Sequence, residues 1–405
     1  MLKSVEPAQA RELILSIGTT APSTETLPLT ELFGRVLAED VYAEIPIPPF
    51  DRSPFDGYAF RGADTANATA ENPVTLKITE EIPAGSVPTV DITEGFAAKI
   101  LTGAPLPNGA DATVKYEQTE FTDTTVTFTA PVKPNSDVVR AGDDVKLGAL
   151  AARRGDVISP AAVGLLASLG RTEVVVYRRP RAAILNTGSE LVEPGNPLPF
   201  GKIHNSSVFS LTGSLAALGI DAYNAGVVRD DPQAIADAIA ENLPKCDVMF
   251  TTGGASVGDY DFAGGAADRL GANILFWKTK LKPGGAMLAS EKDGKLVLAL
   301  SGNPGSALIG LLHIAAPFLF RLAGRREIQP EAVEVHLKKP YKGSTTRTRL
   351  LRGRLEISGG RAYFAEEGEQ GGGALSSFHG CDLLGEIPAG SPALDAGALI
   401  MAYRI

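Results

Sequence analysis

The pattern of apolar and polar positions divides the chain into stretches with different periods. From Arg181 to about Gly324, apolar runs such as RAAIL, DVMFTT and KLVLAL alternate with helical stretches, one of them from Ser206 to Leu218. Runs of this kind, joined by short Gly-rich turns, are typical of parallel strands that alternate with helices. We therefore predict a doubly wound α/β domain here, with its ligand crevice at the C-terminal ends of the strands.

Two other regions are rich in strand-forming residues. Between Ile45 and about Val139, the segments Val74–Ile78, Ala97–Leu101 and Thr124–Thr129 carry many β-branched and aromatic residues, and PAG, PNG and PNS turns separate them. After the α/β region the helical period disappears and short strands return to the end of the chain. The sequence thus predicts one small β-rich module before the α/β domain and another after it.

Helix signals flank the first β-rich module. We expect the first ~45 residues to be helical, with Pro7 near the start of a helix. Ser159 and Pro160 form an N-cap and first helical position, and Gly170 supplies a stop. If these helices pack together, the β-rich module is an insertion in a discontinuous helical domain.

Composition narrows the classes of function. The chain has 405 residues and a net charge of −9, a sign that repels a phosphate backbone, so we expect no nucleic acid partner. Its two cysteines, Cys246 and Cys381, form no CxxC, which fits a reducing cytoplasm. The most apolar stretch, Ala307–Leu322, is shorter than the roughly 20 residues that span a bilayer. We expect a buried core helix there and no direct membrane insertion.

Charged segments follow the predicted strands. Because the carboxyl ends of parallel strands meet at one edge of a sheet, these side chains are expected to line one crevice. The carboxylates are Glu190, Asp230, Asp231, Asp259 and Asp261, and the lysines are Lys278, Lys280 and Lys282.

Two Gly-rich loops are candidates for binding phosphate. TGGASVG (Thr252–Gly258) and SGNPGS (Ser301–Ser306) follow predicted strands, and N–H groups at the start of a following helix attract anions. Carboxylates beside a bound phosphate would repel it unless a divalent cation lies between them, so Mg²⁺ is implied. The combination predicts phosphoryl or nucleotidyl chemistry on an anionic ligand.

Each of these candidates also has a purely structural interpretation. Asp231 precedes Pro232 and is expected to cap a helix, whereas Asp230 has no such task and is the better ligand candidate. Glycines at strand ends also serve tight turns. None of the four histidines pairs at metal-ligand spacing, and no GxSxG, HExxH or Walker A pattern occurs. These absences weigh against hydrolase, metalloprotease and P-loop functions.

Several motifs, taken together, point to a family. PFDRSPFDGYAFRG (Pro49–Gly62), KILTGAPLPNGAD (Lys99–Asp111), NTGSEL, GVVRDDP, GGASVGDYDF and LSGNPGSA follow one another along the chain. In this order they resemble the molybdopterin molybdenumtransferases, the family that includes the gephyrin E domain. The resemblance covers nearly the whole chain and implies an elongated homodimer of four-domain subunits.

The resemblance implies the following division of the chain. Residues 1–44 and 140–178 form a discontinuous N-terminal linker and dimerisation domain, and residues 45–139 form the inserted β-rich domain. Residues 179–327 form a molybdopterin-binding α/β domain, and residues 328–405 form a C-terminal β-barrel.

The resemblance also implies an activity in molybdenum cofactor biosynthesis in the cytoplasm. The family takes adenylylated molybdopterin and molybdate, cleaves the adenylyl group with Mg²⁺, inserts molybdenum into the dithiolene and releases AMP. The matching catalytic positions are Asp56, Thr102, Asp144, Glu190, Asp230, Asp261, Lys278 and Lys282. The expected metal ligands are Glu190, Asp230 and Asp261. The expected substrate-binding positions are Gly253, Gly254, Ser256, Gly258, Ser301, Gly302, Asn303, Pro304 and Arg352. Asp56 and Thr102 are expected to complete the cleft of the dimer partner.

The chain departs from the family pattern at the presumed molybdate pocket. The family's KPGKP reads KPGGA here, with Gly285 in place of a lysine, and QGS reads QGG, with Gly372 in place of a serine. Losing one charge-assisted contact costs roughly 1.5–3 kcal/mol, so we expect a weaker oxyanion site and reduced activity. The alternative function is a gephyrin-like dimeric scaffold that binds peptide tails of a cytoskeletal (cell-division) or membrane protein. A transferase that takes tungstate in place of molybdate is a third alternative.

Overall fold

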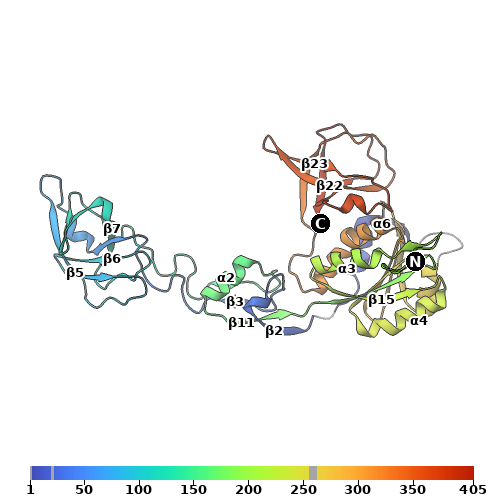
Figure 1. The fold of residues 1–405 in the computed structure, drawn as a ribbon, viewed down its shortest axis with the longest axis horizontal. Coiled ribbons are helices and arrows are strands. Elements are labelled where there is room, and N and C mark those ends of the chain that lie inside the picture. Colours follow the sequence, from blue (N-terminus) through green and yellow to red (C-terminus); the bar gives the residue numbers. More distant parts are fainter. Residues whose placement is uncertain (1, 20–21, 255–261) are drawn as a thin grey trace.

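The chain forms a long, bent molecule with three parts along its length (Figure 1). The computed structural model describes residues 2–19, 22–254 and 262–405. The inserted β-rich module lies at one end, and the α/β domain with the C-terminal barrel lies at the other (Figure 1). A small module, which we call the arm, lies between them and contains α2 (Pro160–Ser168).

A seven-stranded mixed sheet forms the centre of the α/β domain. Its strand order is β1-β17-β19-β20-β16-β12-β15. Neighbouring strands from β20 to β15 run parallel, whereas β19 is antiparallel to both of its neighbours. The strands are β1 (Leu2–Val5), β12 (Arg181–Thr187), β15 (Asp221–Val228), β16 (Val248–Thr252), β17 (Asn273–Thr279), β19 (Leu288–Lys292) and β20 (Lys295–Leu300).

The antiparallel strand β19 was missed by the sequence analysis. It forms a hairpin with β20 around Asp293 and Gly294, both of which have positive φ (52° and 73°). Asp-Gly is the sequence pair most typical of such two-residue hairpin turns. The sequence therefore contains the signal for this hairpin, although its strand breaks the strand–helix alternation of the domain.

Helices cover both faces of this sheet, as a doubly wound fold requires. Along β12, Ala182 and Ile184 face one hydrophobic cluster, whereas Ala183 and Leu185 face the other. The first cluster includes residues of α1, α3 and the long C-terminal helix, and the second includes residues of α4 and α5. The helices of this domain are α1 (Pro7–Leu15), α3 (Ser207–Ala217), α4 (Pro232–Asn242), the short η4 (Leu243–Lys245), α5 (Phe262–Leu270), α6 (Pro304–Ile309), the π-helical turn η5 (Gly310–Ala315) and α7 (Ala316–Leu322). The predicted cap is confirmed, since the side chain of Asp231 accepts a hydrogen bond from the amide of Ala234 at 2.7 Å.

The predicted core helix is also present. Pro304–Leu322 is long and apolar enough to span a bilayer, but 78% of its most apolar window is buried inside the protein. Its residues share one hydrophobic cluster with residues of the sheet and with Leu350 and Leu384 of the barrel.

The prediction that the first ~45 residues are helical is wrong for most of this segment. Of the residues that the structure describes among the first ~45, only Pro7–Leu15 forms an α-helix, and this segment does not belong with the arm. Leu2–Val5 extends the α/β sheet parallel to β17, and Ala10 and Ile14 are buried in the core of that domain. The apolar positions of α1 indicated a helix, but they did not indicate which sheet it covers.

The arm is built from segments on both sides of the insertion, and it contains two short sheets where a helical domain was expected. Its two short sheets are β2 (Thr24–Pro28) with β11 (Glu173–Tyr177), and β3 (Val41–Tyr42) with β10 (Leu150–Ala152). The short helix η1 (Leu29–Glu31) also belongs to it. Ser159 caps α2 by accepting from the amide of Ala162 at 3.2 Å, and Gly170 follows it with φ of 77°.

The inserted module is a six-stranded sheet in the order β7-β4-β6-β5-β9-β8. Its strands are β4 (Gly57–Phe60), β5 (Val74–Ile82), β6 (Phe96–Ile100), β7 (Ala112–Lys115), β8 (Glu120–Phe121) and β9 (Thr125–Phe128), with the short helices η2 (Gly62–Thr65) and η3 (Tyr116–Gln118). All three segments predicted as strands are confirmed. Phe60 and Phe128, with ring centroids 4.5 Å apart, pack in its core.

The C-terminal region closes into a five-stranded barrel. The strand order is β22-β23-β21-β25-β24, and β24 pairs back with β22. The strands are β21 (Ala332–Leu337), β22 (Thr348–Ser358), β23 (Arg361–Glu366), β24 (Leu383–Ile387) and β25 (Leu399–Arg404), with the short helix η6 (Ser376–Phe378). A short strand from the α/β domain, β18 (Leu281–Lys282), pairs with β22 and ties the barrel to the sheet. The remaining pair is β13 (Leu191–Val192) with β14 (Ile203–His204).

Candidate active site

A cavity of about 480 Å³ opens at the C-terminal ends of β12, β16 and β20. It is the crevice that the fold predicts, and it collects loops that lie far apart in the sequence. The predicted site residues that line it are Glu190, Asp230, Gly253, Gly254, Ser301, Gly302 and Asn303. Pro304, the first residue of α6, is not one of the residues that line the crevice.

Two glycines of this crevice have no room for a side chain. Gly253 has φ of 95°, and a Cβ there would lie 2.4 Å from the hydroxyl of Thr187. Gly188 has φ of 142°, and a Cβ there would lie 2.4 Å from the carboxylate of Glu190. Gly253 lets the loops after β16 and β12 pass close to each other and exposes its backbone in the crevice, whereas Gly188 makes room for the side chain of Glu190 in its own loop.

The two described carboxylates of the crevice come from neighbouring loops. The amide of Ser189 donates to Oδ2 of Asp230 at 3.4 Å, which joins the NTGSE and RDD loops. Within residues 2–19, 22–254 and 262–405, no group of three or more His, Cys, Asp or Glu could hold a metal. Asp261, Ser256 and Gly258 lie outside the described residues. Mg²⁺ often takes only one or two protein carboxylates together with substrate phosphates, so Glu190 and Asp230 fit such an ion.

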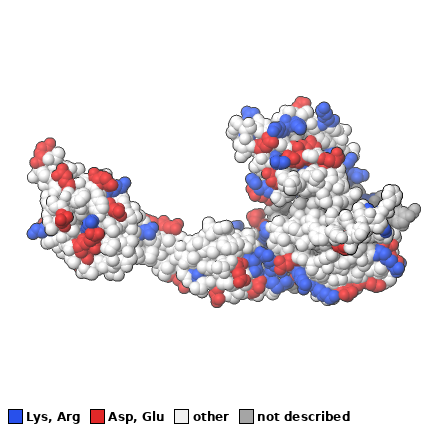
Figure 2. Space-filling model, viewed as in Figure 1, with Lys and Arg blue, Asp and Glu red and all other residues white. Residues whose placement is uncertain are grey.

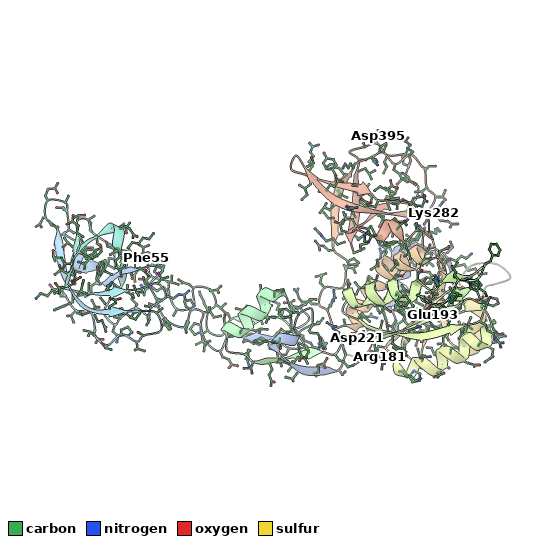
Figure 3. The ribbon with its side chains drawn as sticks, viewed as in Figure 1. Phe55, Arg181, Glu193, Asp221, Lys282 and Asp395 are labelled. Atoms are coloured by element: carbon green, nitrogen blue, oxygen red, sulfur yellow. The ribbon has the colours of Figure 1, made fainter. Side chains whose placement is uncertain are left out.

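A second cavity, of about 640 Å³, lies between the α/β domain and the barrel, and we call it the interdomain cleft. Lys278 and Lys282 line it from the α/β side, and Arg347 and Arg349 line it from the barrel. Figure 3 shows Lys282 where these two parts meet. The hydroxyl residues Ser344–Thr346 also line it, and the described lining contains no Asp or Glu. Four cations without a carboxylate among them make this cleft attractive to an oxyanion.

The interdomain cleft adjoins the crevice, since Ala286 lines both cavities. The sequence predicts that Lys278, Lys280 and Lys282 line one crevice together. Lys280 does not line the interdomain cleft and forms an ion pair with Glu6 at 2.7 Å. Arg347 and Arg349 were missed, because only the docking of the barrel brings them opposite the lysines.

The two departures from the family pattern differ in the room that they leave, because Gly285 lies against backbone carbonyls whereas Gly372 lies against the rotatable hydroxyl of Ser306. A Cβ on Gly285 would lie 2.5 Å from the carbonyl of Leu281 and 2.7 Å from that of Thr279. A Cβ on Gly372 would lie 2.4 Å from the hydroxyl of Ser306. The carbonyl of Gly372 also accepts from the amide of Ser306 at 2.9 Å, so one N–H at the start of α6 is already occupied.

Arg352, expected to contact an anion, is fully buried in the barrel. Its guanidinium donates to the hydroxyl of Ser377 at 2.9 Å and to the carbonyls of Glu369 and Gly371 at 2.9 and 3.1 Å. These bonds hold the loop that carries Gly372. Arg352 therefore holds this loop of the barrel and lines neither the crevice nor the interdomain cleft.

Three predicted residues lie far from the crevice within one chain. Asp56 and Thr102 are on the inserted module, and their neighbour Phe55 is labelled there in Figure 3. Asp144 lies in the segment that returns from that module, where its amide donates to the carbonyl of Ile47 at 3.0 Å. The structure brings Asp56 and Thr102 together but separates them from Glu190 and Asp230.

The carboxylate of Asp56 is held ready in its ionised form. Its Oδ1 accepts from the hydroxyl and the amide of Thr102, both at 2.7 Å. These two bonds, the hydroxyl first, lower the pKa of Asp56 below its usual 3.8. A fully exposed carboxylate that is fixed by its neighbours is available to a partner molecule.

Taken together, the fold and its cavities define a multidomain α/β protein with a Gly-rich crevice that adjoins a cleft beneath a C-terminal barrel, and four cations line that cleft. Three family models match successive parts of the chain. They are the MoeA N-terminal region (domain I and II) over residues 4–170, the probable molybdopterin binding domain over residues 183–321, and the MoeA C-terminal region (domain IV) over residues 334–404.

Curated relatives and solved structures agree with these matches. A molybdopterin molybdenumtransferase of Staphylococcus aureus (strain Mu50) is 32% identical over 372 residues, which is 92% of this chain and 89% of the relative. The crystal structure of the molybdopterin biosynthesis moeA protein from Pyrococcus horikoshii OT3 is 30% identical. It superposes with a TM-score of 0.85 and covers 99% of this chain and 100% of that one. The chain therefore belongs to the MoeA family of molybdenum cofactor biosynthesis.

Proposed function

We propose that this chain inserts molybdate-derived molybdenum into adenylylated molybdopterin and releases AMP in a Mg²⁺-dependent reaction. Two adjoining cavities carry the proposal. Glu190, Asp230 and two Gly-rich loops line the crevice, and four cationic side chains line the interdomain cleft beside it. Few ligands need both environments at once. A substrate that contains phosphates, together with a separate oxyanion, needs both.

In this proposal the crevice binds the nucleotide and the phosphates. Gly253 and Gly254 after β16, and Ser301–Asn303 after β20, present backbone groups to the phosphate oxygens. Glu190 and Asp230 would hold Mg²⁺, which supplies charge neutralisation for the phosphoanhydride that is broken. Lys278 and Lys282, on the adjoining wall of the interdomain cleft, add positive charge beside the phosphates.

The interdomain cleft binds the oxyanion in this proposal. The family lysine is absent at Gly285 and the family serine at Gly372, which had suggested a damaged pocket. Arg347 and Arg349, together with Lys278 and Lys282, still surround the cleft with positive charge. Guanidinium groups bind tetrahedral oxyanions through paired N–H donors, so the cleft is suited to molybdate or tungstate.

We further propose that the active form is a homodimer in which the inserted module completes the site of its partner. Asp56 and Thr102 cannot reach the crevice of their own chain, since the arm holds the two ends of the molecule apart (Figure 1). Exposed apolar side chains along the arm support an interface with a second copy. They include Phe33, Tyr42, Leu147 and Val157, which are 53%, 51%, 68% and 43% exposed. Figure 2 shows broad uncharged areas over this part of the surface.

The test measures AMP release from adenylylated molybdopterin with Mg²⁺, with and without molybdate. Asp56→Asn and Asp230→Asn should each strongly reduce AMP release, and a mixture of the two variants should restore part of it. A mixed dimer has one site with both changes and one site with neither, which is why activity returns only if the site is shared. No AMP release by folded, dimeric protein would overturn the proposal and favour the peptide-binding scaffold.

A further inference from the structure

Two short segments connect the arm with the inserted module, and we call them together the neck (Figure 1). The neck consists of residues 45–52, which lead out to the module, and residues 139–146, which return from it. At the arm end, the amide of Ile47 donates to the carbonyl of Val145 at 2.8 Å. At the module end, Arg52 and Val139 exchange backbone hydrogen bonds at 2.9 and 3.1 Å. Both ends of the neck are therefore held as a two-stranded antiparallel ribbon.

The backbone pairing is interrupted in the middle of the neck. The last pairing on the arm side is the amide of Gly142 with the carbonyl of Pro48, at 3.0 Å. From there to the pairing of Arg52 with Val139, the outgoing segment has three residues and the returning segment has two. These residues, all of them described by the structure, share no backbone hydrogen bond across the neck. Pro49 has no N–H to donate, and the unequal lengths put the other groups out of register.

The carboxylate of Asp51 fills this gap. Its Oδ1 accepts from the amide of Ala141 at 2.8 Å, and its Oδ2 accepts from the guanidinium of Arg140. Partial burial raises the pKa of Asp51, but the bonds from Ala141 and Arg140 outweigh this effect and hold the pKa below its usual 3.8. The carboxylate is therefore ionised at neutral pH and bonded through both oxygens. A side chain supplies the connection that the backbone leaves out.

The residues that follow Asp51 hold the pair formed by Asp56 and Thr102. Ser53 is buried, and its carbonyl accepts from the amide of Gly103 at 2.9 Å. Gly103 directly follows Thr102, whose amide and hydroxyl bind Asp56. The outgoing segment and the exposed carboxylate are thus joined by short, directional contacts. A rotation of the outgoing segment at the gap would carry Asp56 with it.

We propose that Asp51 is a positioning residue whose carboxylate fixes the angle between the arm and the inserted module and so directs Asp56 into the crevice of the second subunit. Asp51 does not touch the substrate, and this proposal rests on the proposed function, because Asp56 acts on another chain only in the proposed dimer. The neck lies between the arm and the group that must be placed, so an error in its angle becomes a displacement of that group. A misplacement of about 1 Å costs up to about 100-fold in rate.

The first readout is the distance between the arm and the inserted module in the full chain. Spin labels on Ala167→Cys of α2 and Lys77→Cys of β5, both at exposed positions, report it by pulsed electron paramagnetic resonance. The background carries Cys246→Ala and Cys381→Ser, and the labelled protein is diluted with unlabelled protein so that pairs within one chain dominate.

Three variants of this protein are compared. Asp51→Ala removes both acceptors, whereas Asp51→Asn retains one acceptor oxygen for the amide of Ala141. Glu81→Ala is the matched control, because it removes an ion pair with Lys99, at 3.0 Å, that lies wholly within the inserted module. We expect Asp51→Ala to broaden the distance distribution, Asp51→Asn to broaden it less, and Glu81→Ala to leave it unchanged.

The second readout is AMP release by single variants and by mixtures. Asp51→Ala should lower kcat about tenfold with little change in KM, and Asp51→Asn should stay within about threefold of the parent. Mixing Asp51→Ala with Asp230→Asn should restore activity, because one site of the mixed dimer then has an intact module and an intact crevice. Mixing Asp51→Ala with Asp56→Asn should restore none, because both modules of that dimer are impaired.

An NMR titration of the Asp56 carboxyl carbon separates a change of angle from damage to the module. The pKa of Asp56 should be the same in Asp51→Ala as in the parent, since Thr102 still holds the carboxylate. An altered pKa, an unchanged distance distribution in Asp51→Ala or an equal change in Glu81→Ala would overturn the proposal, as would equal recovery in the two mixtures. If the parent protein releases no AMP, the proposed function fails, but the distance measurement still decides whether Asp51 fixes the neck.

Discussion

Asp56 accepts two hydrogen bonds from Thr102, one from its amide and one from its hydroxyl, each at 2.7 Å. The two residues are 46 positions apart and meet where β4 and β6 run side by side. The pair fixes the direction of an exposed carboxylate on the face of the inserted module. Its ionisation can therefore be tested separately from catalysis.

We expect Thr102→Val to raise the pKa of Asp56 towards 3.8, because the hydroxyl is the first cause of its depression and the amide bond remains. A pKa depressed by folding stabilises the fold above the unfolded value, and this contribution is lost as pH falls through the folded value. The effect on stability is small at an exposed site. An NMR titration of the Asp56 carboxyl carbon measures the shift. An unchanged pKa would show that the hydroxyl does not hold this carboxylate in solution.

Neighbouring aspartates after β15 allow a matched comparison. Asp230 lines the crevice, whereas Asp231 caps α4 through the amide of Ala234. Asp230→Asn should lower AMP release by about 100-fold or more, since it removes a carboxylate that would bind the Mg²⁺ beside the phosphates. Asp231→Asn should leave both activity and stability close to normal, because Asn caps as well as Asp. Asp231→Ala should cost about 1 kcal/mol of stability without a catalytic effect. Equal losses of activity in the two Asn variants would contradict this assignment.

Restoring the family lysine at Gly285 should not restore the family pocket. A Cβ there meets the carbonyls of Leu281 and Thr279 at 2.5 and 2.7 Å, and both are backbone atoms that cannot rotate away. We expect Gly285→Ala and Gly285→Lys to destabilise the α/β domain by about 1–3 kcal/mol, as overpacking does. Urea denaturation measures the change. Gly213→Ala on α3, where a Cβ meets nothing within 4 Å, is the control and should be neutral or stabilising. A lysine at position 285 that improves molybdate binding at unchanged stability would refute this.

Two arginines of β22 should behave differently. Arg352 is fully buried and holds Ser377 and two carbonyls, so Arg352→Lys should destabilise the barrel by about 2–4 kcal/mol. Arg349 lines the interdomain cleft, so Arg349→Gln should weaken molybdate binding about tenfold with little loss of stability. Calorimetric titration with molybdate and thermal unfolding separate the two effects. Weakened molybdate binding in a stable Arg352→Lys protein would instead support a direct anion contact.

The buried His313 predicts a dependence of stability on pH. Its folded pKa of about 3 lies below the unfolded 6.5, so the unfolded state binds more protons between these values. Stability should therefore fall as pH decreases from about 6.5, by up to about 1.4 kcal/mol per pH unit from this group. His313→Gln cannot titrate and should lose less stability between pH 7 and 5. Identical slopes in urea denaturation over this range would show that His313 is not buried neutral in solution.

The sequence by itself largely determined where the helices start and where the strands end. Pro232 after Asp231 and Pro160 after Ser159 marked two helix starts, because a side-chain acceptor and a residue without an N–H suit the first turn. Strand ends marked by Glu190 and Asp230 predicted a crevice, because parallel strands end at one edge. Helix caps and strand ends depend on interactions between residues that are close together in the sequence, so the sequence alone is enough to predict them.

Tertiary structure decided the contacts between distant segments. The position of α1 on the α/β sheet, the meeting of Arg347 and Arg349 with Lys278 and Lys282, and the burial of Arg352 depend on how domains dock. The crowding around Gly285 likewise comes from carbonyls that the chain folds against it. Docking energies are sums of many weak, non-directional contacts, so no short motif encodes them. The residue types of the site were therefore readable from the sequence, whereas which of them face one another was settled only by the packing of the barrel and the N-terminal segment against the sheet.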